Sequence, residues 1–97
     1  MFEIRFSEDA ERHVKQFSKR DQGIILDAIE EQLSHQPTLQ TRNRKLLREN
    51  PLAAWEVRVQ EFRVLYNVEE ETSTVFVVAI AVKEGNKFII DGQEYPL

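Results

Sequence analysis

Trp55-Glu-Val-Arg-Val-Gln-Glu-Phe-Arg-Val-Leu-Tyr66 is the stretch that decides the fold. Apolar and polar side chains alternate on both sides of a tight centre at residues 60–61, the pattern of two half-buried strands joined as a hairpin. A slip of one residue would mix apolar with charged positions on each face, so the pattern determines the register. The predicted cross-strand pairs are Val59 with Phe62, Val57 with Val64, and Arg58 with Arg63.

This register sets two arginines side by side on the exposed face of the hairpin. Like charges directly opposite each other destabilise a sheet by up to about 1 kcal/mol. A fold gains nothing from this placement, which therefore points to an anionic ligand, and guanidinium groups match the geometry of phosphate oxygens. Alternatively, Glu56 or Glu61 neutralises Arg58 diagonally and the face is an ordinary solvated surface. The sequence supports both interpretations.

The totals indicate one soluble globular domain. The chain has 97 residues, 41% of them hydrophobic and 31% charged, which suits a single core. No apolar run approaches the ~20 residues of a membrane-spanning helix. There is no cysteine, and the N-terminus lacks the basic and apolar segments of a signal peptide, so we expect a cytoplasmic location.

Charge is distributed unevenly along the chain. The formal net charge is −4, yet residues 42–63 carry six basic side chains and three acidic ones. The chain as a whole should repel nucleic acid, but a local basic patch can still bind phosphate because the relevant field is screened within ~10 Å.

The first half of the chain predicts a strand and a helical hairpin. Alternation predicts a strand at residues 2–6. Ser7 followed by acidic residues predicts the N-cap of a helix over residues 8–17. An apolar stripe predicts a second helix over residues 20–35, which Pro37 ends.

The second half predicts a sheet. Residues 38–54 are polar and expected to be irregular, residues 74–82 are apolar enough for a central strand covered on both sides, and Asp91-Gly92 predicts the turn of a terminal hairpin. The fold class is α+β: an N-terminal strand, a helical hairpin, then an antiparallel sheet of three or more strands. The predicted core contains Ile25, Ile29, Leu33, Trp55, Val57, Val64, Tyr66, Val77 and Ala79.

Few side chains are candidates for chemistry. His13 and His35 have no partner at metal-ligand spacing, so we expect neither a metal nor another cofactor. The remaining candidates are Arg58, Arg63 and Lys83. These basic side chains could bind an RNA backbone and stabilise a developing phosphorane.

Four stretches carry a resemblance to a known family. They are Lys45-Leu46-Leu47, Trp55-Glu-Val-Arg58, Phe62-Arg-Val-Leu-Tyr66 and Val82-Lys-Glu-Gly-Asn-Lys87. With these stretches and the order β-α-α-β-β-β, the chain resembles the RelE/ParE superfamily of toxins from bacterial type II toxin–antitoxin systems over essentially its whole length.

The resemblance implies one of two activities. RelE-like members are endoribonucleases (mRNA interferases) that cleave messenger RNA on the ribosome, whereas ParE-like members inhibit DNA gyrase. Both are neutralised by an antitoxin. For the nuclease, the resemblance assigns catalysis to Arg58, Arg63 and Lys83. The residues expected to bind flanking RNA are Arg42, Arg44, Lys45, Arg48 and Lys87.

Two departures from the family pattern bear on activity. Val82 stands where this branch has a histidine, and Ile89 where nucleases carry a catalytic tyrosine. Tyr95 could substitute if the terminal hairpin folds back. The alternatives are a non-nucleolytic toxin and a catalytically decayed interaction module.

The resemblance also implies a partner. We expect an antitoxin segment that is disordered until bound, with an acidic stretch over Arg58 and Arg63 and apolar anchors in neighbouring grooves.

Overall fold

The central hairpin forms in the predicted register. β3 (Trp55–Val59) pairs antiparallel with β4 (Phe62–Glu69), with Val57 opposite Val64 and Arg58 opposite Arg63. Gln60 takes the positive φ of 56° that the two-residue turn requires. Trp55 stacks on Tyr66 across the strands, with ring centroids 6.2 Å apart.

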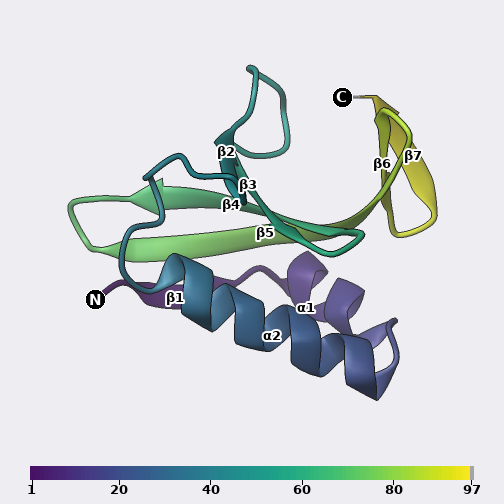
Figure 1. The fold of residues 1–97 in the computed structure, drawn as a ribbon, viewed down its shortest axis with the longest axis horizontal. Helices are drawn as coiled ribbons and strands as arrows, with labels where there is room; N and C mark the ends of the chain where they lie inside the picture. The colour runs from purple at the N-terminus through teal and green to yellow at the C-terminus, as the bar shows by residue number, and fades with distance from the viewer. Residues whose placement is uncertain (97) are drawn as a thin grey trace.

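The computed structural model describes residues 1–96, in which one sheet is covered on one face by both helices (Figure 1). The sheet has seven strands in the order β2-β3-β4-β5-β6-β7, all antiparallel, while β1 pairs parallel with β5. The remaining strands are β1 (Glu3–Phe6), β2 (Arg44–Leu46), β5 (Thr74–Glu84), β6 (Lys87–Ile90) and β7 (Gln93–Pro96). The α+β class and the antiparallel sheet are confirmed.

The two helices begin where serines cap them. Ser7 accepts a hydrogen bond from the amide of Ala10 at the start of α1 (Glu8–Lys15), and Ser18 caps α2 (Lys19–Leu33) in the same way. Each helix ends two residues before its predicted end. For α1 the reason is the extended backbone that Ser18 needs as the next N-cap. Neither helix is long and apolar enough to span a bilayer.

A bulge in β5 divides the core between two faces of the sheet. Tyr66 pairs with Val77, but the preceding Leu65 pairs with Ala79, so Val78 is an extra residue. Ala79 therefore lies on the face away from the helices, and its predicted place in the main core is wrong. The other predicted core residues pack between helices and sheet, with Trp55 only partly buried.

The face away from the helices carries a smaller core. It contains Ala53, Leu65, Ala79, Ala81, Phe88 and Ile90. The loop of residues 47–54 covers part of it, held by Asn50, whose side chain donates to the Ala53 carbonyl and accepts from the Leu52 amide. Residues 38–54 are thus less irregular than predicted, since β2 forms within them and pairs with β3.

The outer edge of β5 is hydrogen-bonded by three different elements. β1 pairs with residues 74–77 and β6 with residues 82–84. Between them, α1 fills the gap: the Ser7 hydroxyl donates to the Val78 carbonyl at 2.9 Å, and Nδ1 of His13 accepts from the Ile80 amide at 3.2 Å. His13 is therefore a buried structural residue that must stay neutral to accept this hydrogen bond.

This arrangement makes stability depend on pH through His13. Burial lowers the pKa of His13 below its usual value, an effect that Asp91 and Asp9 oppose by attraction and Arg12 adds to by repulsion. The unfolded chain then binds the proton more readily, so the contribution of His13 is complete above the ordinary pKa of ~6.5 and is lost as pH falls below it.

We expect the free energy of unfolding to fall more steeply for the wild type than for His13→Asn between about pH 7.5 and about pH 5.5. Asparagine retains an acceptor for the Ile80 amide but does not titrate. Urea denaturation of both proteins across this range is the measurement. Parallel pH profiles would show that His13 is not the titrating group.

Candidate functional site

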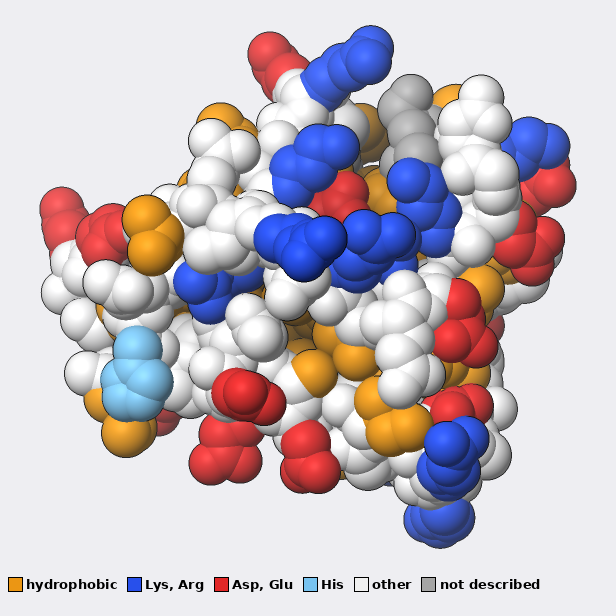
Figure 2. Space-filling view, viewed as in Figure 1, with side chains coloured by type: hydrophobic (Ala, Val, Ile, Leu, Met, Phe, Trp, Pro, Cys, Tyr) orange, Lys and Arg blue, Asp and Glu red, His pale blue; other side chains and the backbone are white. Residues whose placement is uncertain are grey.

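The strand register gathers four cationic side chains on the sheet face away from the helices. Lys45 is the cross-strand partner of Glu56, and Arg58, two residues further along β3, faces Arg63. Lys83 lies two residues after Ala81, the partner of Arg63. Since alternate residues share a face, Lys45, Arg58, Arg63 and Lys83 form one basic surface. Figure 2 shows Lys and Arg side chains gathered around an acidic one in the upper middle of the view.

Arg63 is the buried member of the basic surface. Its side chain is 7% exposed, and Nε lies 3.3 Å from Oε2 of Glu56, which is 13% exposed. Nη1 donates to the carbonyls of Gln60 and Phe62 at 2.7 and 2.8 Å. Burial lowers the pKa of Arg63, Glu56 raises it and Arg58 lowers it further, but an arginine remains charged. The prediction that both arginines stand exposed is wrong for Arg63, and Glu56 pairs with Arg63 instead of Arg58.

The other three members of the basic surface are exposed. Arg58, Lys45 and Lys83 make no side-chain hydrogen bond or ion pair with residues 1–96. Their donors are free for a ligand, and the buried guanidinium of Arg63 adds positive potential beneath them. Four neighbouring cations with only one carboxylate among them repel one another and so destabilise the sheet. The same cations are well placed to bind the phosphates of a ligand.

The remaining predicted RNA-binding residues do not all lie on the same face of the sheet. Arg44 pairs with Val57 and so lies on the helix side, where Nη1 donates to the Gln32 carbonyl at 2.6 Å and ties the end of α2 to β2. Lys87 precedes Phe88 on β6, faces away from the basic surface and forms an ion pair with Glu94 at 3.2 Å. Arg42 and Arg48 are exposed on either side of β2. Arg44 and Lys87 therefore do not join the basic surface.

Val82 and Ile89, the two positions where the resemblance predicts a histidine and a tyrosine, lie on the opposite face of the sheet from these cations. Val82 and Ile89 are direct cross-strand partners, and Val82 packs against the core beneath the helices. A histidine at position 82 would consequently point away from Arg63. Tyr95, by contrast, pairs with Phe88, the partner of Lys83, so it shares the face of the basic surface. Figure 1 shows β6 and β7 bending out of the plane of the sheet toward that side.

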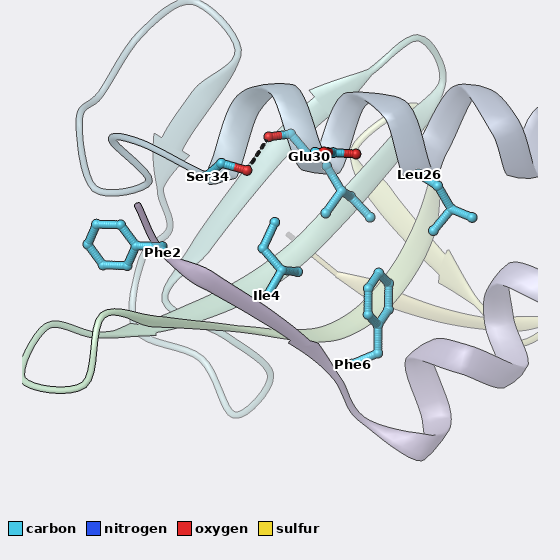
Figure 3. A pocket seen from close by; sticks show the side chains of 7 residues that line it. Phe2, Ile4, Phe6, Leu26, Glu30 and Ser34 are labelled. Carbon is cyan, nitrogen blue, oxygen red and sulfur yellow. Dashed lines mark hydrogen bonds between the residues drawn. The ribbon is translucent and has the colours of Figure 1, made fainter.

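An apolar groove opens on the helix side, between β1 and α2. It has a volume of about 360 Å³, and Figure 3 shows Ile4 and Phe6 of β1 turned toward α2, while Phe2, which precedes β1, lies at the end of the groove near Ser34. β1 pairs with β5 alone among the described strands, so its other edge is free. Residues 1–96 hold no group of three or more His, Asp or Glu side chains placed for a metal ion.

Removing the charge on Glu56 tests whether Arg63 depends on it. Glu56→Gln keeps the shape but leaves a buried guanidinium without its counter-charge, so we expect a loss of about 2 to 3 kcal/mol in the free energy of unfolding. Glu61→Gln, at the exposed turn, is the matched control and should cost less than ~0.5 kcal/mol. Urea denaturation at neutral pH measures both, and equal losses would contradict the assignment.

Comparison with known proteins identifies the fold. No protein-family model matches the sequence, and a search of curated proteins also finds no match. Among solved structures, a chain of the toxin–antitoxin complex RelBE2 from Mycobacterium tuberculosis superposes with a TM-score of 0.73 at 23% sequence identity, covering 84% of this chain and 98% of that one. The chain therefore has the RelE-like fold that its sequence motifs predict.

Proposed function

We propose that this chain is the toxin component of a type II toxin–antitoxin module, and that its basic surface binds messenger RNA on the ribosome and promotes cleavage of the strand. One observation carries the proposal: Lys45, Arg58, Arg63 and Lys83 share one face of a sheet whose fold matches a chain of a toxin–antitoxin complex. The net charge of −4 is compatible with this because the field that a bound phosphate meets is local.

The chemistry needs little from the protein beyond placement and charge. Attack of a ribose 2′-hydroxyl on the adjacent phosphate forms a 2′,3′-cyclic phosphate and breaks the bond from phosphorus to the 5′-oxygen of the next nucleotide. The 2′-hydroxyl gives up its proton, the departing 5′-oxygen takes one up, and negative charge accumulates on the non-bridging oxygens in between. Arg58 and Lys83 have free donors to receive it, and Arg63 supplies a fixed charge that Glu56 and two carbonyls hold in place. Such preorganised donors typically contribute the largest part of catalysis. Tyr95 has the hydroxyl on this face that could transfer a proton.

A second candidate is a toxin without nuclease activity, such as a gyrase inhibitor, or a decayed interaction module. Two observations favour it. Val82 and Ile89 replace the family's histidine and tyrosine, and they lie on the opposite face from Arg58. In addition, three hydrogen-bonding or ionic contacts already occupy the guanidinium of Arg63.

Expression in bacterial cells distinguishes these candidates. We expect the wild type to arrest growth and to cut ribosome-bound message at positions that primer extension maps. Arg58→Ala and Lys83→Ala should each reduce cleavage on the order of 100-fold, because each removes a donor to the developing charge. Lys87→Ala is the matched control, an exposed lysine on the opposite face, and should cleave normally.

Growth arrest that survives Arg58→Ala and Lys83→Ala, with messenger RNA intact, would contradict the nuclease. A gyrase supercoiling assay with the same variants would then test the second candidate.

The proposal includes an antitoxin, and two surfaces would receive it. The basic surface suits an acidic stretch, and the groove beside β1 suits apolar anchors of an extended or helical segment. These surfaces lie on opposite faces of the sheet, so one segment would have to wrap around the domain. Wrapping of this kind is typical of partners that are disordered until they bind.

Each surface should affect a different rate constant of the complex with the product of the adjacent reading frame. Exposed charges steer association, so Arg58→Ala should slow it, and rising salt should slow the wild type on the order of tenfold. Leu26→Asp, at a half-exposed groove position, should chiefly speed dissociation. Surface plasmon resonance across a salt series measures both. Association that is indifferent to salt and to Arg58→Ala would place the partner elsewhere.

A further inference from the structure

A second cavity, of about 210 Å³, lies between α1, the loop of residues 47–54 and the β6–β7 hairpin. Its apolar lining comes from Leu52, Ala79 and Ile90, beside the ring of Tyr95. Its polar lining comes from His13 and Asp91 together with Asp9, Arg12 and Gln93. The volume is below the roughly 300 to 1,000 Å³ of pockets for drug-sized molecules, so the cavity suits a single small ring system.

His13 supplies a hydrogen-bond donor to this cavity. Its Nδ1 accepts from the Ile80 amide, so the proton of the neutral ring resides on Nε2. The residue is 4% exposed, and Nε2 makes no hydrogen bond within residues 1–96. Every fully buried side-chain nitrogen or oxygen in the described part of the chain has a hydrogen-bond partner. Because Nε2 has no partner, it is not fully buried and must reach open space. The space that His13 lines is this cavity.

Asp91 supplies a fixed acceptor at the rim. Gln16 Nε2 donates to Oδ1 at 2.6 Å, and Arg12 Nη2 lies 3.1 Å from Oδ2. These contacts hold the carboxylate and lower the pKa of Asp91, chiefly through the hydrogen bond from Gln16. Each carboxylate oxygen can accept a second hydrogen bond, so acceptor capacity remains for a ligand.

The cavity adjoins the basic surface on the same face of the sheet. Ala79 lies two residues before Ala81, the partner of Arg63, and Tyr95 lies two strands from Lys83. Strand spacing makes the second separation on the order of 10 Å. A nucleotide chain with a phosphate at the basic surface could therefore bring a neighbouring base to the cavity.

We infer that this cavity binds one keto base, guanine or uracil, of single-stranded RNA; this rests on the proposed function, which makes RNA the substrate. The base carbonyl accepts from Nε2 of His13, the adjacent ring N–H donates to Asp91, and the ring stacks on Tyr95. Adenine has no carbonyl, and the carbonyl of cytosine has no ring N–H beside it. The cavity therefore selects between bases, while the basic surface holds the backbone.

Amide chemical shifts of the ¹⁵N-labelled full chain test this without the ribosome. Guanosine and uridine 5′-monophosphates should shift the amides of His13, Ile80 and Tyr95, with dissociation constants about tenfold below those of adenosine and cytidine 5′-monophosphates. Inorganic phosphate should shift the amides of the basic surface and leave those of the cavity unchanged. Equal affinities for the four nucleotides, or cavity amides that no nucleotide shifts at roughly 10 mM, would overturn the inference.

Two variants separate binding from folding. His13→Asn keeps an acceptor for Ile80, but its side chain is too short to place a donor at the position of Nε2. Asp91→Asn removes the carboxylate at an exposed turn position whose φ of 54° asparagine tolerates. Both should lose the preference for keto bases. If His13→Asn fails to fold, Asp91→Asn alone decides, and Glu94→Gln on the same hairpin is the matched control.

The outcome is distinguishable from that of the proposed function. Selective binding of keto bases without cleavage of messenger RNA would support the base-binding cavity and contradict the nuclease. Cleavage of messenger RNA by a protein whose cavity binds no base would support the nuclease and contradict the base-binding cavity. Cavity amides that respond only to the product of the adjacent reading frame would assign the cavity to a protein side chain and overturn the inference.

Discussion

The hydrogen bonding of β5 along its outer edge is the constraint on which the rest of the structure depends. No single strand covers this edge: β1 and β6 pair with its two ends, and α1 bonds the part between them through Ser7 and His13. Buried amides and carbonyls require partners, so α1 must sit at this edge. The position of α1 then fixes where α2, the next element in the chain, begins. It also brings His13, Arg12 and Gln16 to the terminal hairpin.

The basic surface shows how a domain can keep a cluster of like charges. Arg63 is held by Glu56 and by two carbonyls of its own hairpin, so its charge is satisfied and immobile. Arg58, directly opposite, has no such partner within the described residues and extends into solvent. An immobile cation beneath a free one costs stability through repulsion, yet it presents a potential that needs no rearrangement when an anion arrives. The solvated-face interpretation expected Glu56 or Glu61 to neutralise Arg58, but Glu56 pairs with Arg63, and the Arg58 side chain has no ionic partner among the described residues.

The face of the sheet decides which residues can act together. The sequence resemblance predicts a histidine and a tyrosine at the positions of Val82 and Ile89, but both positions belong to the helix side, whereas Lys83 and Tyr95 belong to the side of the basic surface. The same division separates Arg44, which ties α2 to β2, from its neighbour Lys45. Residues adjacent in the chain therefore have unrelated roles, because successive side chains of a strand point to opposite faces.

The sequence by itself determined the hairpin register, the Ser7 cap, the Asp91-Gly92 turn and the α+β order, because alternation, capping and turn chemistry are local. It could also have indicated burial of His13, which has helical spacing with Ala10, Val14 and Phe17. The tertiary structure alone decided that a bulge moves Ala79 to the other face, that Glu56 pairs with Arg63, and that His13 opens into a cavity beside Tyr95. These features depend on contacts between segments far apart in the chain, and no local pattern contains that information.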